Sequence, residues 1–515
     1  MSRALTIPHC AEAAAARWPD AVAVIDGEAR LSFAELRERM IEAAAAYVAA
    51  GLRPGDRVAI WAQNSLDWIV ACLGLQAAGG VLIPLNTRFK GSEAQFILGR
   101  ARATMAIVAD EFLGTRYADI LAEAEIPTVR RVVRLGVDAP DGWAAFLAGA
   151  DAAARTEAER RLAALDEHDL ADIMFTSGTT GDPKGAMATH GQAVRTAYLW
   201  SKATTIGPGD RFLILYPFFH CAGYKAGWLV NLAIGATTLP EPTLDVDRLL
   251  DRVEREKVTF LPGPPTLFQT LLAMPQRRPE VLASVRVSIT GASAVAPSLI
   301  EAMRRELGIP VVLTGYGLTE TCGTVTMTSP SDPPEIVTVS CGRAIEGIEV
   351  ICADAEGTPL PPGEAGEVLV RGMNVMLGYL DDPAATAEAI DQQGWLHTGD
   401  IGVLDEAGYL RITDRKKDVF IVGGFNCYPA EIEKMLLAHP AIQQVAVTGI
   451  PDERMGEVGK AFVVLKPGAV LDEAALIAWS RERMANFKVP RAVAFLDALP
   501  MNATGKVQKF KLAGA

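Results

Sequence analysis

Apolar and polar positions in the first three hundred residues follow two alternating periods. Ser32 precedes an apolar repeat of helical spacing, and Glu35 stands three residues later, which predicts a helix that begins with a capping box. Residues 57–61 and 81–85 are short apolar runs and are expected to be buried strands. The same patterns predict an apolar helix at 68–78 and strands at 106–109, 171–175, 212–215, 258–261, 285–289 and 311–313. Units of strand and helix at this spacing imply an α/β domain whose parallel sheets are covered by helices.

The pattern changes after about residue 340. Short apolar runs between Gly/Pro turns predict a small antiparallel β-barrel that closes the large domain, with strands at 348–352, 366–371 and 409–413. A charged run at 415–418 follows. Beyond it we expect an α+β unit with helices at 430–438 and 471–484 and strands at 445–449 and 461–465. The chain is therefore predicted to have a large N-terminal domain at 1–414 and a smaller C-terminal domain at 415–515.

One loop of ten residues, 176–185, concentrates hydroxyl groups, glycines and a lysine after the apolar run 171–175. Glycines let backbone N–H groups approach an anion, and a lysine adds a positive charge, so the loop is a candidate phosphate site. It is not a Walker A loop, since Pro183 and Gly185 stand where that motif needs Gly and Ser or Thr. Taken alone, the loop could also be a flexible surface loop.

Five further motifs follow it in order. They are PFFH at 217–220, TGYGLTET at 314–321, GWLHTGD at 394–400, DRKKD at 414–418 and PMNATGK at 500–506. Together with the loop they resemble the adenylate-forming enzymes, which include acyl-CoA ligases, firefly luciferase and the adenylation domains of peptide synthetases. The resemblance covers nearly the whole chain. It implies that a carboxylate attacks the α-phosphate of Mg-ATP to give an acyl-adenylate, and that CoA then displaces AMP to give a thioester.

The resemblance assigns the nucleotide site. The phosphate loop would hold the β- and γ-phosphates through Thr176, Ser177, Gly178, Thr179, Thr180, Gly181 and Lys184. Glu320, with Thr180, would bind Mg²⁺, which prefers oxygen ligands; in isolation Glu320 could be a solvated acid. The base and the α-phosphate would be contacted by Gly291, Ala292, Ser293, Gly315, Tyr316, Gly317 and Thr319. Asp400 and Arg415 would bind the ribose.

The resemblance also implies that the C-terminal domain is mobile and that Lys417 is its hinge. Lys506 would bridge the attacking carboxylate and the α-phosphate in the first step, although most lysines are simply on the surface. His220 would be a gate that blocks and then opens the path of the pantetheine arm; a buried structural histidine is the alternative. In the second step the arm would pass Gly423 and Gly424, and Lys488 would meet a CoA phosphate, unless Lys488 is only a solvated lysine.

Composition limits the partners. The net charge of −13 argues against a nucleic-acid binder, whereas residues 415–515 carry 14 Lys/Arg and 10 Asp/Glu, a net of +4. That basic region suits CoA or reflects chance surface composition. Seven cysteines without metal spacing, no signal sequence and no long apolar span predict a cytoplasmic protein without a membrane segment. Its partners are expected to be a small carboxylic acid, ATP and CoA, with a homodimer left open.

The acid is expected to lie against residues 221–227, Gly315 and 322–324. Small residues at 222, 223, 226 and 227 predict a roomy apolar pocket for a medium or long chain or a fused-ring acid, with Lys225 facing outward or meeting the substrate. Residues 218–225 and 423–428 also resemble ligases of actinobacterial sterol breakdown, which activate an indanedione propanoate. Alternatives are an enzyme that loads a carrier protein, a luciferase-type oxygenase and a non-catalytic nucleotide-binding subunit.

Overall fold

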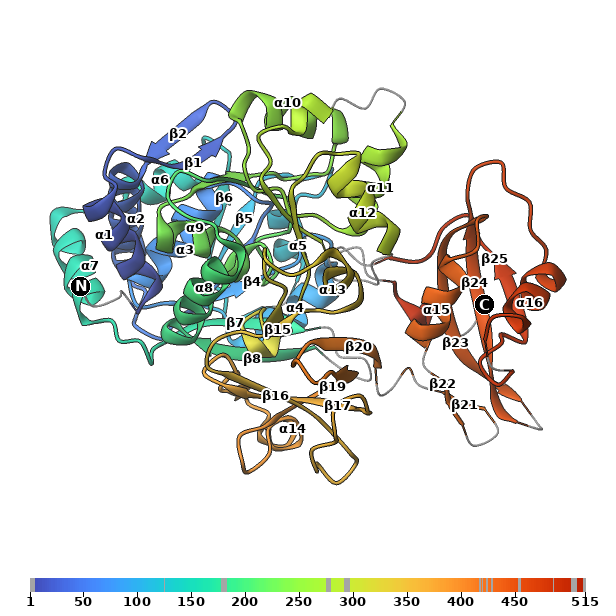
Figure 1. The fold of residues 1–515 in the computed structure, drawn as a ribbon. Coiled ribbons are helices and arrows are strands. Elements are labelled where there is room, and N and C mark those ends of the chain that lie inside the picture. Colours follow the sequence, from blue (N-terminus) through green and yellow to red (C-terminus); the bar gives the residue numbers. More distant parts are fainter. Residues whose placement is uncertain are drawn as a thin grey trace.

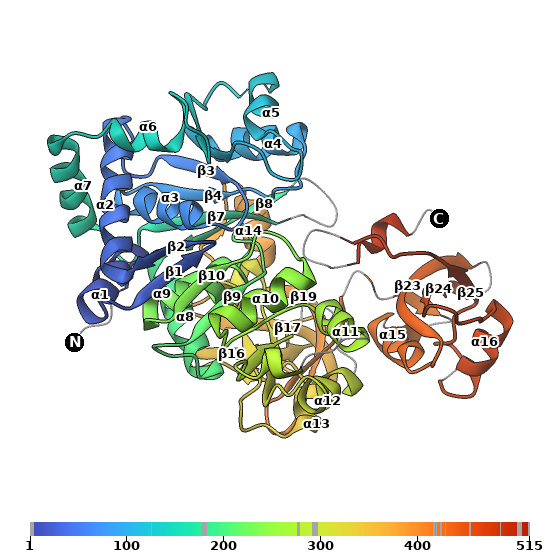
Figure 2. The ribbon, with the colours of Figure 1, turned by 90° about the horizontal axis from the view of Figure 1, so that it is seen from above.

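The structure is a computed structural model. It describes residues 5–124, 126–176, 183–274, 279–290, 297–415, 418, 420–422, 425–427, 429–452, 455–484, 486–501 and 507–512. Figures 1 and 2 show a large body of sheets and helices that contains β1 to β20, and a smaller unit built from β21 onward.

A seven-stranded sheet forms the first layer, in the order β18-β8-β7-β4-β3-β5-β6. Its strands are β3 (Arg57–Trp61), β4 (Val81–Pro84), β5 (Met105–Ala109), β6 (Arg131–Leu135), β7 (Leu170–Thr176), β8 (Lys184–Thr189) and β18 (Gly378–Tyr379). The pairs from β7 to β6 are parallel, whereas β8 and β18 are antiparallel. The inner parallel strands β3, β4 and β5 are almost wholly buried because helices cover the sheet.

Helices of the first layer are α2 (Phe33–Ala49), α3 (Leu66–Ala77), α4 (Gly91–Ala101), α5 (Tyr117–Glu123), α6 (Trp143–Ala148) and α7 (Ala152–Ala164). The capping box predicted at Ser32 and Glu35 is present at the start of α2. Helix α3 begins two residues before its predicted start because Ser65 caps it by accepting from Trp68 N. A Cβ added at Gly74 would lie 2.3 Å from Ala43 Cβ, so small residues let α2 and α3 pack closely.

A second layer is formed by two sheets, β2-β1-β10-β9 and β11-β12, whose pairs are parallel except for β1 with β2. The strands are β1 (Val22–Asp26), β2 (Ala29–Ser32), β9 (Arg211–Ile214), β10 (Thr237–Pro240), β11 (Val287–Ile289) and β12 (Val311–Leu313). Its helices are α1 (Ile7–Arg17), α8 (His190–Thr204), α9 (Leu229–Ile234), α10 (Val246–Glu256), α11 (Pro265–Ala273), α12 (Pro297–Arg305), α13 (Pro334–Val339) and the short η2 (Pro279–Leu282).

The predicted strand at 258–261 is wrong. Phe260 makes only isolated bridges, to Phe212 on one side and Val287 on the other. Thr259 N and Phe260 N both donate to the Arg211 carbonyl, so the regular ladder is interrupted. Pro262 follows and has no N–H with which to extend the strand.

The predicted small antiparallel unit is a four-stranded half-barrel in the order β16-β17-β19-β20. It contains β16 (Ile348–Ala353), β17 (Ala365–Gly372), β19 (Leu396–Leu404) and β20 (Leu410–Arg415), with α14 (Pro383–Ala389) beside it. A short sheet joins it to the large body through β13 (Gly315–Tyr316), β14 (Thr326–Met327) and β15 (Arg343–Ala344).

The C-terminal unit has a sheet in the order β22-β21-β24-β23, to which β25 adds beside β24. Its elements are β21 (Phe420–Val422), β22 (Phe425–Cys427), α15 (Pro429–Leu437), β23 (Ile442–Asp452), β24 (Gly456–Leu465), α16 (Glu473–Arg481), β25 (Ala492–Phe495) and η4 (Lys509–Lys511). It has its own apolar core, centred on Phe420, Ile432 and Val463. Strand β20 belongs to the half-barrel sheet and β21 to this one, so the chain passes between the units after Arg415.

Candidate active site

The phosphate loop begins and ends on a hairpin. Thr176 closes β7 and Lys184 opens β8, and the two residues are paired across the hairpin. The Thr176 hydroxyl donates to the Lys184 carbonyl at 3.4 Å. Ser177, Gly178, Thr179, Thr180 and Gly181 lie outside the described residues. The hairpin thus fixes both ends of the loop on the large body.

Glu320 lies in a tight turn, η3 (Thr319–Thr321), that follows β13. The turn is closed because Leu318 N donates to Thr321 Oγ1 at 3.0 Å and Gly323 N donates to the Leu318 carbonyl at 2.8 Å. The Glu320 side chain is half-buried, and Oε1 accepts a hydrogen bond of 2.9 Å from the hydroxyl of Tyr379.

Tyr379 is a site residue that sequence reasoning missed. It lies on β18, which pairs with β8, and its ring centroid is 5.3 Å from Lys184 Nζ. Burial and the nearby Glu320 carboxylate raise the pKa of Tyr379, so its hydroxyl stays protonated and donates. The structure therefore brings Glu320, Tyr379 and Lys184 together. The GYL run at 378–380 is the sequence signal that could have identified Tyr379.

Tyr316 and Asp400 meet at a second point of the same region. The Tyr316 hydroxyl donates to Asp400 Oδ2 at 2.6 Å, and burial together with that carboxylate raises the pKa of Tyr316 well above its usual value. Asp400 is 6% exposed, and its backbone N–H donates to Thr398 Oγ1. In the half-barrel register Asp400 is opposite Arg415, so both predicted ribose residues occur at one level of the sheet.

Two predicted glycines lie where the chain approaches itself closely. A Cβ added at Gly317 would lie 2.3 Å from the Gly323 carbonyl oxygen, and one at Gly315 would lie 3.1 Å from the Thr326 carbonyl oxygen. Gly317 therefore cannot be replaced without moving the turn that carries Glu320. Gly291, Ala292 and Ser293 lie outside the described residues.

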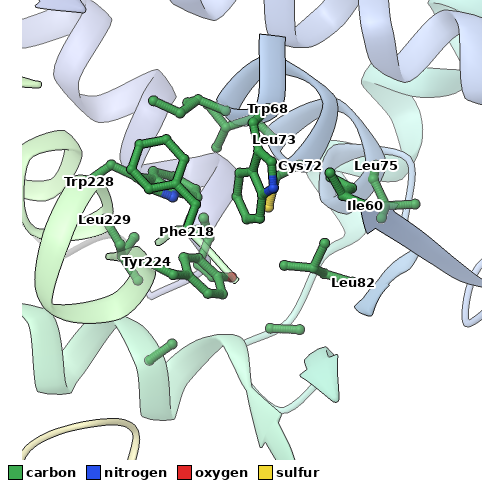
Figure 3. Packing of buried hydrophobic residues seen from close by; sticks show 14 of the residues in the cluster. Ile60, Trp68, Cys72, Leu73, Leu75, Leu82, Phe218, Tyr224, Trp228 and Leu229 are labelled. Carbon is green, nitrogen blue, oxygen red and sulfur yellow. The ribbon is translucent and has the colours of Figure 1, made fainter. Parts of the chain in front are cut away.

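His220 lies in the gate segment, which we define as residues 217–228. His220 N donates to the Pro217 carbonyl, and the ring Nδ1 accepts from Ala222 N at 3.2 Å. A neutral ring therefore carries its proton on Nε2. The segment continues as a π-helix, η1 (Tyr224–Trp228), whose rings pack on Trp68 together with Phe218 (Figure 3).

Asn64 anchors the chain that leads into the gate segment, and sequence reasoning missed it as well. Its Nδ2 donates to the carbonyls of Ile214, Tyr216 and Glu241, and its Oδ1 accepts from Phe218 N at 2.7 Å. Asn64 is 5% exposed and follows strand β3. A polar residue at the carboxyl end of a parallel strand was the available signal.

Lys225 does not face outward. It is buried, with Nζ 2.8 Å from Asp172 Oδ1 and 3.9 Å from Cys322 Sγ. Burial raises the pKa of Asp172, whereas the Asp172 carboxylate raises the pKa of Lys225 although burial alone would lower it. Gly223 is equally closed in, since a Cβ there would lie 2.3 Å from the Pro217 carbonyl oxygen. Part of the small-residue run therefore serves close packing.

Two family models match the chain. Residues 11–380 match the model for the AMP-binding enzyme, and residues 431–506 match that for the AMP-binding enzyme C-terminal domain. The chain belongs to the AMP-binding enzyme family. The prediction of an adenylate-forming enzyme is confirmed.

This AMP-binding enzyme is similar to two named ligases along almost all of its length. It is 48% identical over 98% of its length to the 7a-methyl-1,5-dioxo-octahydro-1H-inden-4-yl propanoyl:CoA ligase of Rhodococcus jostii (strain RHA1), of which it covers 97%. The same identity and coverage of the chain hold for the ligase of that name from Mycobacterium tuberculosis (strain ATCC 25618 / H37Rv), of which it covers 98%. Among solved structures, ATP-bound MatB from Rhodopseudomonas palustris is similar, with a TM-score of 0.89, 32% identity and coverage of 98% of both chains.

The site of this AMP-binding enzyme fits magnesium bound together with a nucleotide. No group of three His, Cys, Asp or Glu side chains able to hold a metal ion occurs among the described residues. A single half-buried carboxylate such as Glu320 suits Mg²⁺, which usually takes one or two protein carboxylates and fills its other positions with phosphate oxygens and water.

Of the predicted site residues beyond Arg415, Lys488 is the one that lies within the described residues. Lys488 Nζ lies 5.6 Å from the centroid of the Phe487 ring, within the C-terminal unit. Lys417, Gly423, Gly424 and Lys506 lie outside the described residues, as does the side chain of Arg415. The roles of these residues and the domain boundary at 414–415 stay predictions. In the part of the chain that the structure describes, no helix has the length and apolar character needed to span a membrane.

Proposed function

We infer that this chain is an ATP-dependent, AMP-forming acyl-CoA ligase. A carboxylate and ATP would give an acyl-adenylate and pyrophosphate, and CoA would then give acyl-CoA and AMP. The observation that carries this function is that Tyr316 and Glu320, four residues apart, reach Asp400 and Tyr379 respectively. The loop therefore connects two ends of the proposed nucleotide site. At one end the Asp400 carboxylate would accept the ribose hydroxyl groups. At the other end Tyr379, which donates to Glu320, lies beside Lys184, a predicted phosphate contact.

In the first step, Asp400 would accept the ribose hydroxyls and Tyr316 would stack on the base. Glu320 and Thr180 would hold Mg²⁺, which supplies charge neutralisation on the phosphates when bound. Lys506 would then hold the acid's carboxylate against the α-phosphate. Two anions must approach each other here, so positioning and positive charge matter more than a nucleophilic side chain.

In the second step, rotation about Lys417 would bring Gly423 and Gly424 to the site and remove Lys506 from it. His220 would open the path of the pantetheine arm, and Lys488 would meet a phosphate of CoA. Support for a defined position of the His220 ring comes from its Nδ1 contact with Ala222 N, which holds the ring in the turn.

We propose further that the acid is a bulky, ring-derived propanoate, in the class of the bicyclic diketone named for the 48% identical relatives. Support comes from the partly exposed residues where the gate segment meets the Glu320 turn. These residues, Ala222, Ala226, Gly317 and Gly323, carry a methyl group or no side chain. A Cβ at Gly323 would lie 2.8 Å from Cys221 Cβ, so the two segments are in contact.

The test is detection of acyl-CoA by mass spectrometry with ATP, Mg²⁺ and CoA, over short, medium and long fatty acids, aryl acids and bicyclic ring-propanoates. We expect kcat/KM to be at least tenfold higher for a bicyclic acid than for any linear one. Ala226→Leu should lower kcat/KM for the bicyclic acid about tenfold, and a short linear acid, measured on the same variant, should change less than twofold.

The panel separates the alternatives. Preference for a medium-chain fatty acid would refute the proposed acid and leave the ligase function standing. Pyrophosphate release without any thioester would indicate a carrier protein as the acceptor, and nucleotide binding without pyrophosphate release would indicate a non-catalytic subunit. Lys506→Ala is expected to abolish adenylation yet leave the reaction of CoA with a supplied acyl-adenylate largely intact, and equal loss of both steps would refute its role.

We propose a cytoplasmic location, supported by all seven cysteines being thiols, as in proteins of a reducing compartment. A homodimer is the other open proposal, and light scattering of the purified chain tests it.

A further inference from the structure

We propose that Tyr379 is a positioning residue of the nucleotide site, which fixes the Glu320 carboxylate for Mg²⁺ and holds Lys184 at a set distance from it. The inference rests on the proposed binding of Mg-ATP. It concerns a residue outside the predicted site, on a segment far along the chain from the other two.

The backbone of the segment that carries Tyr379 is fixed on both sides. Met376 N donates to the Glu320 carbonyl at 2.8 Å, which ties the segment to the Glu320 turn. Leu377 N donates to the Met187 carbonyl at 2.9 Å and Leu380 N to the Gly185 carbonyl at 2.8 Å, which ties it to the strand that Lys184 opens. The segment therefore connects the Glu320 turn to the hairpin formed by β7 and β8.

The side chain of Tyr379 has little freedom to leave this position. Its backbone N–H donates to Thr386 Oγ1 at 2.9 Å. The preceding residue, Gly378, has φ of +139°, and a Cβ there would lie 2.7 Å from Thr386 Cγ2. Only glycine fits at that position, and this sets the direction in which the next side chain leaves the strand.

The Tyr379 side chain serves two groups of opposite charge. Its hydroxyl donates to Glu320 Oε1 at 2.9 Å, and its ring lies 5.3 Å from Lys184 Nζ. A carboxylate has about four lone-pair sites, so this one hydrogen bond leaves room for a metal ion. The ring attracts the ammonium group without neutralising it. Tyr379 thus orients an anionic ligand and a cationic phosphate contact at the same time.

A hydrogen bond that orients a metal ligand changes metal affinity most when the protein supplies few ligands to the metal. Partners that orient a metal ligand typically change metal affinity about 10–100-fold when they are removed. Mg²⁺ would depend on Glu320 and Thr180 for its protein contacts. We therefore expect loss of the phenol hydroxyl to weaken the contribution of the metal to nucleotide binding, and not the binding of the nucleotide itself.

The experiment measures binding of a non-hydrolysable α,β-methylene analogue of ATP by calorimetry, in EDTA and over a Mg²⁺ series, for the whole chain. Tyr379→Phe should leave the metal-free Kd within twofold of wild type and raise the Mg²⁺ concentration at the midpoint about tenfold. Tyr379→Leu also removes the ring beside Lys184, and should weaken metal-free binding several-fold as well.

The matched control is Tyr409→Phe. The Tyr409 hydroxyl donates to Asp332 Oδ1 at 2.7 Å, which is the same kind of bond, but neither residue belongs to the predicted site. This variant should bind the analogue and Mg²⁺ like wild type. A thermal unfolding curve for each variant checks the fold, and Tyr379→Phe decides the question even if Tyr379→Leu does not fold.

Two results would overturn the inference. One is an unchanged Mg²⁺ midpoint in Tyr379→Phe. The other is an equal weakening with and without Mg²⁺, which would show that Tyr379 only supports the fold. If the wild type itself shows no Mg²⁺-dependent binding of the analogue, the proposed function fails, and that outcome is distinct from both.

Discussion

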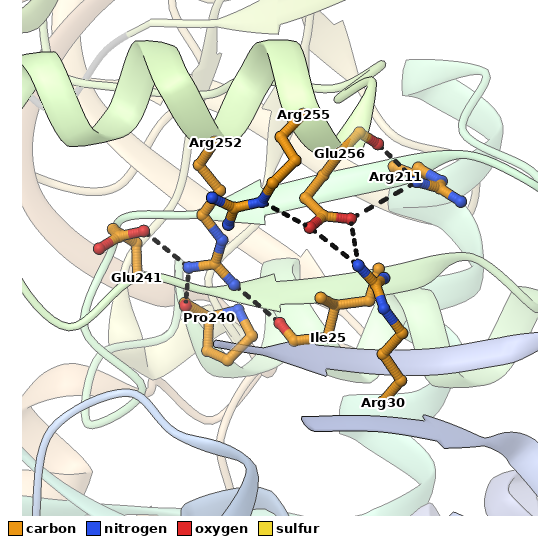
Figure 4. Close-up of polar contacts among 8 residues, drawn as sticks. All are labelled: Ile25, Arg30, Arg211, Pro240, Glu241, Arg252, Arg255 and Glu256. Atoms are coloured by element: carbon orange, nitrogen blue, oxygen red, sulfur yellow. Dashed lines mark hydrogen bonds and ion pairs between the residues drawn. The ribbon is translucent and has the colours of Figure 1, made fainter. Parts of the chain in front are cut away.

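Lys225 and Arg252 are both buried cations, 2% and 4% exposed, but their surroundings differ. The Arg252 guanidinium on α10 donates to the carbonyls of Ile25 and Pro240 at 2.7 and 2.6 Å and to Glu241 Oε2 at 2.6 Å (Figure 4). Lys225 has one carboxylate, Asp172, at 2.8 Å and a thiol at 3.9 Å. The arginine donates to two carbonyls and a carboxylate, whereas the lysine has one carboxylate partner and a weaker thiol contact.

The difference follows from the chemistry of the two cations and from where they lie. A planar guanidinium presents donors in a fixed fork and can tie several chain segments together. Arg252 joins α10 to the edges of β1 and β10. Lys225 is a compact charge, and it joins strand β7, which leads to the phosphate loop, to the gate segment and to Cys322 beside the Glu320 turn. A buried charge can thus stabilise a sheet, or it can couple the segments of a site.

The largest effect on stability is expected from breaking the buried ion pair between Lys225 and Asp172. Asp172→Leu leaves the Lys225 ammonium buried without its partner and should lower the free energy of the first unfolding transition in urea by about 3–5 kcal/mol. The control is Asp172→Leu with Lys225→Met, which removes both charges and should recover most of that loss. Equal instability of the single and double variants would show that packing, and not charge, is what Asp172 provides.

Arg252→Lys tests the buried arginine and its three acceptors. Lysine keeps the charge but cannot reach all three acceptors, so buried carbonyls lose their hydrogen bonds, at a cost of about 2–3 kcal/mol. The same urea transition measures this. Adenylation measured well below the transition should be unchanged, because Arg252 does not touch the candidate site; a loss of adenylation in the folded variant would contradict that separation.

His190 extends the comparison to a buried ionisable group that stays neutral. Burial lowers its pKa to about 3, and its Nδ1 accepts from Ile7 N at 3.4 Å. The unfolded chain binds a proton near the ordinary pKa of about 6.5 and the native chain does not, so stability is full above that pH and falls as the pH drops toward 3. Between pH 7 and pH 5 this group should cost about 2 kcal/mol.

The measurement is urea unfolding of wild type and His190→Gln at both pH values. Glutamine can still accept from Ile7 N but does not titrate, so the loss between pH 7 and pH 5 should be about 2 kcal/mol smaller in the variant. Parallel pH profiles for the two proteins would mean that His190 is not the group responsible.

The smallest effect is expected at the surface. Lys202 Nζ lies 2.7 Å from Glu346 Oε2, nearly the distance found in the buried pair, but the side chains are 52% and 73% exposed. Glu346→Gln should change the unfolding free energy by less than about 0.5 kcal/mol, because water already solvates both charges. A loss comparable to that of Asp172→Leu would show that burial is not what separates the two lysine pairs.

Local patterns were enough to predict much of the fold. The capping box at Ser32 and the strands at 57–61 and 311–313 occur as expected, because each depends on neighbouring residues in the sequence. Hydrophobic spacing also predicted the parallel layers and the α+β unit. The motifs identified the family, and with it the residues that form the two ends of the candidate nucleotide site, since short runs such as 314–321 carry both a turn and its functional groups.

Hydrophobic spacing and short motifs were therefore sufficient for the α/β and α+β organisation and for the family, and through the family for the proposed two-step chemistry. The tertiary structure alone decided that Phe260 only bridges its neighbours, that Lys225 is buried against Asp172, and that Tyr379 reaches Glu320 across 59 positions of sequence. The physical reason is the same in each case. Whether a strand completes its ladder, a charge finds a partner or a hydroxyl finds a carboxylate depends on segments far apart in the chain, and only folding brings them within a few ångströms of one another.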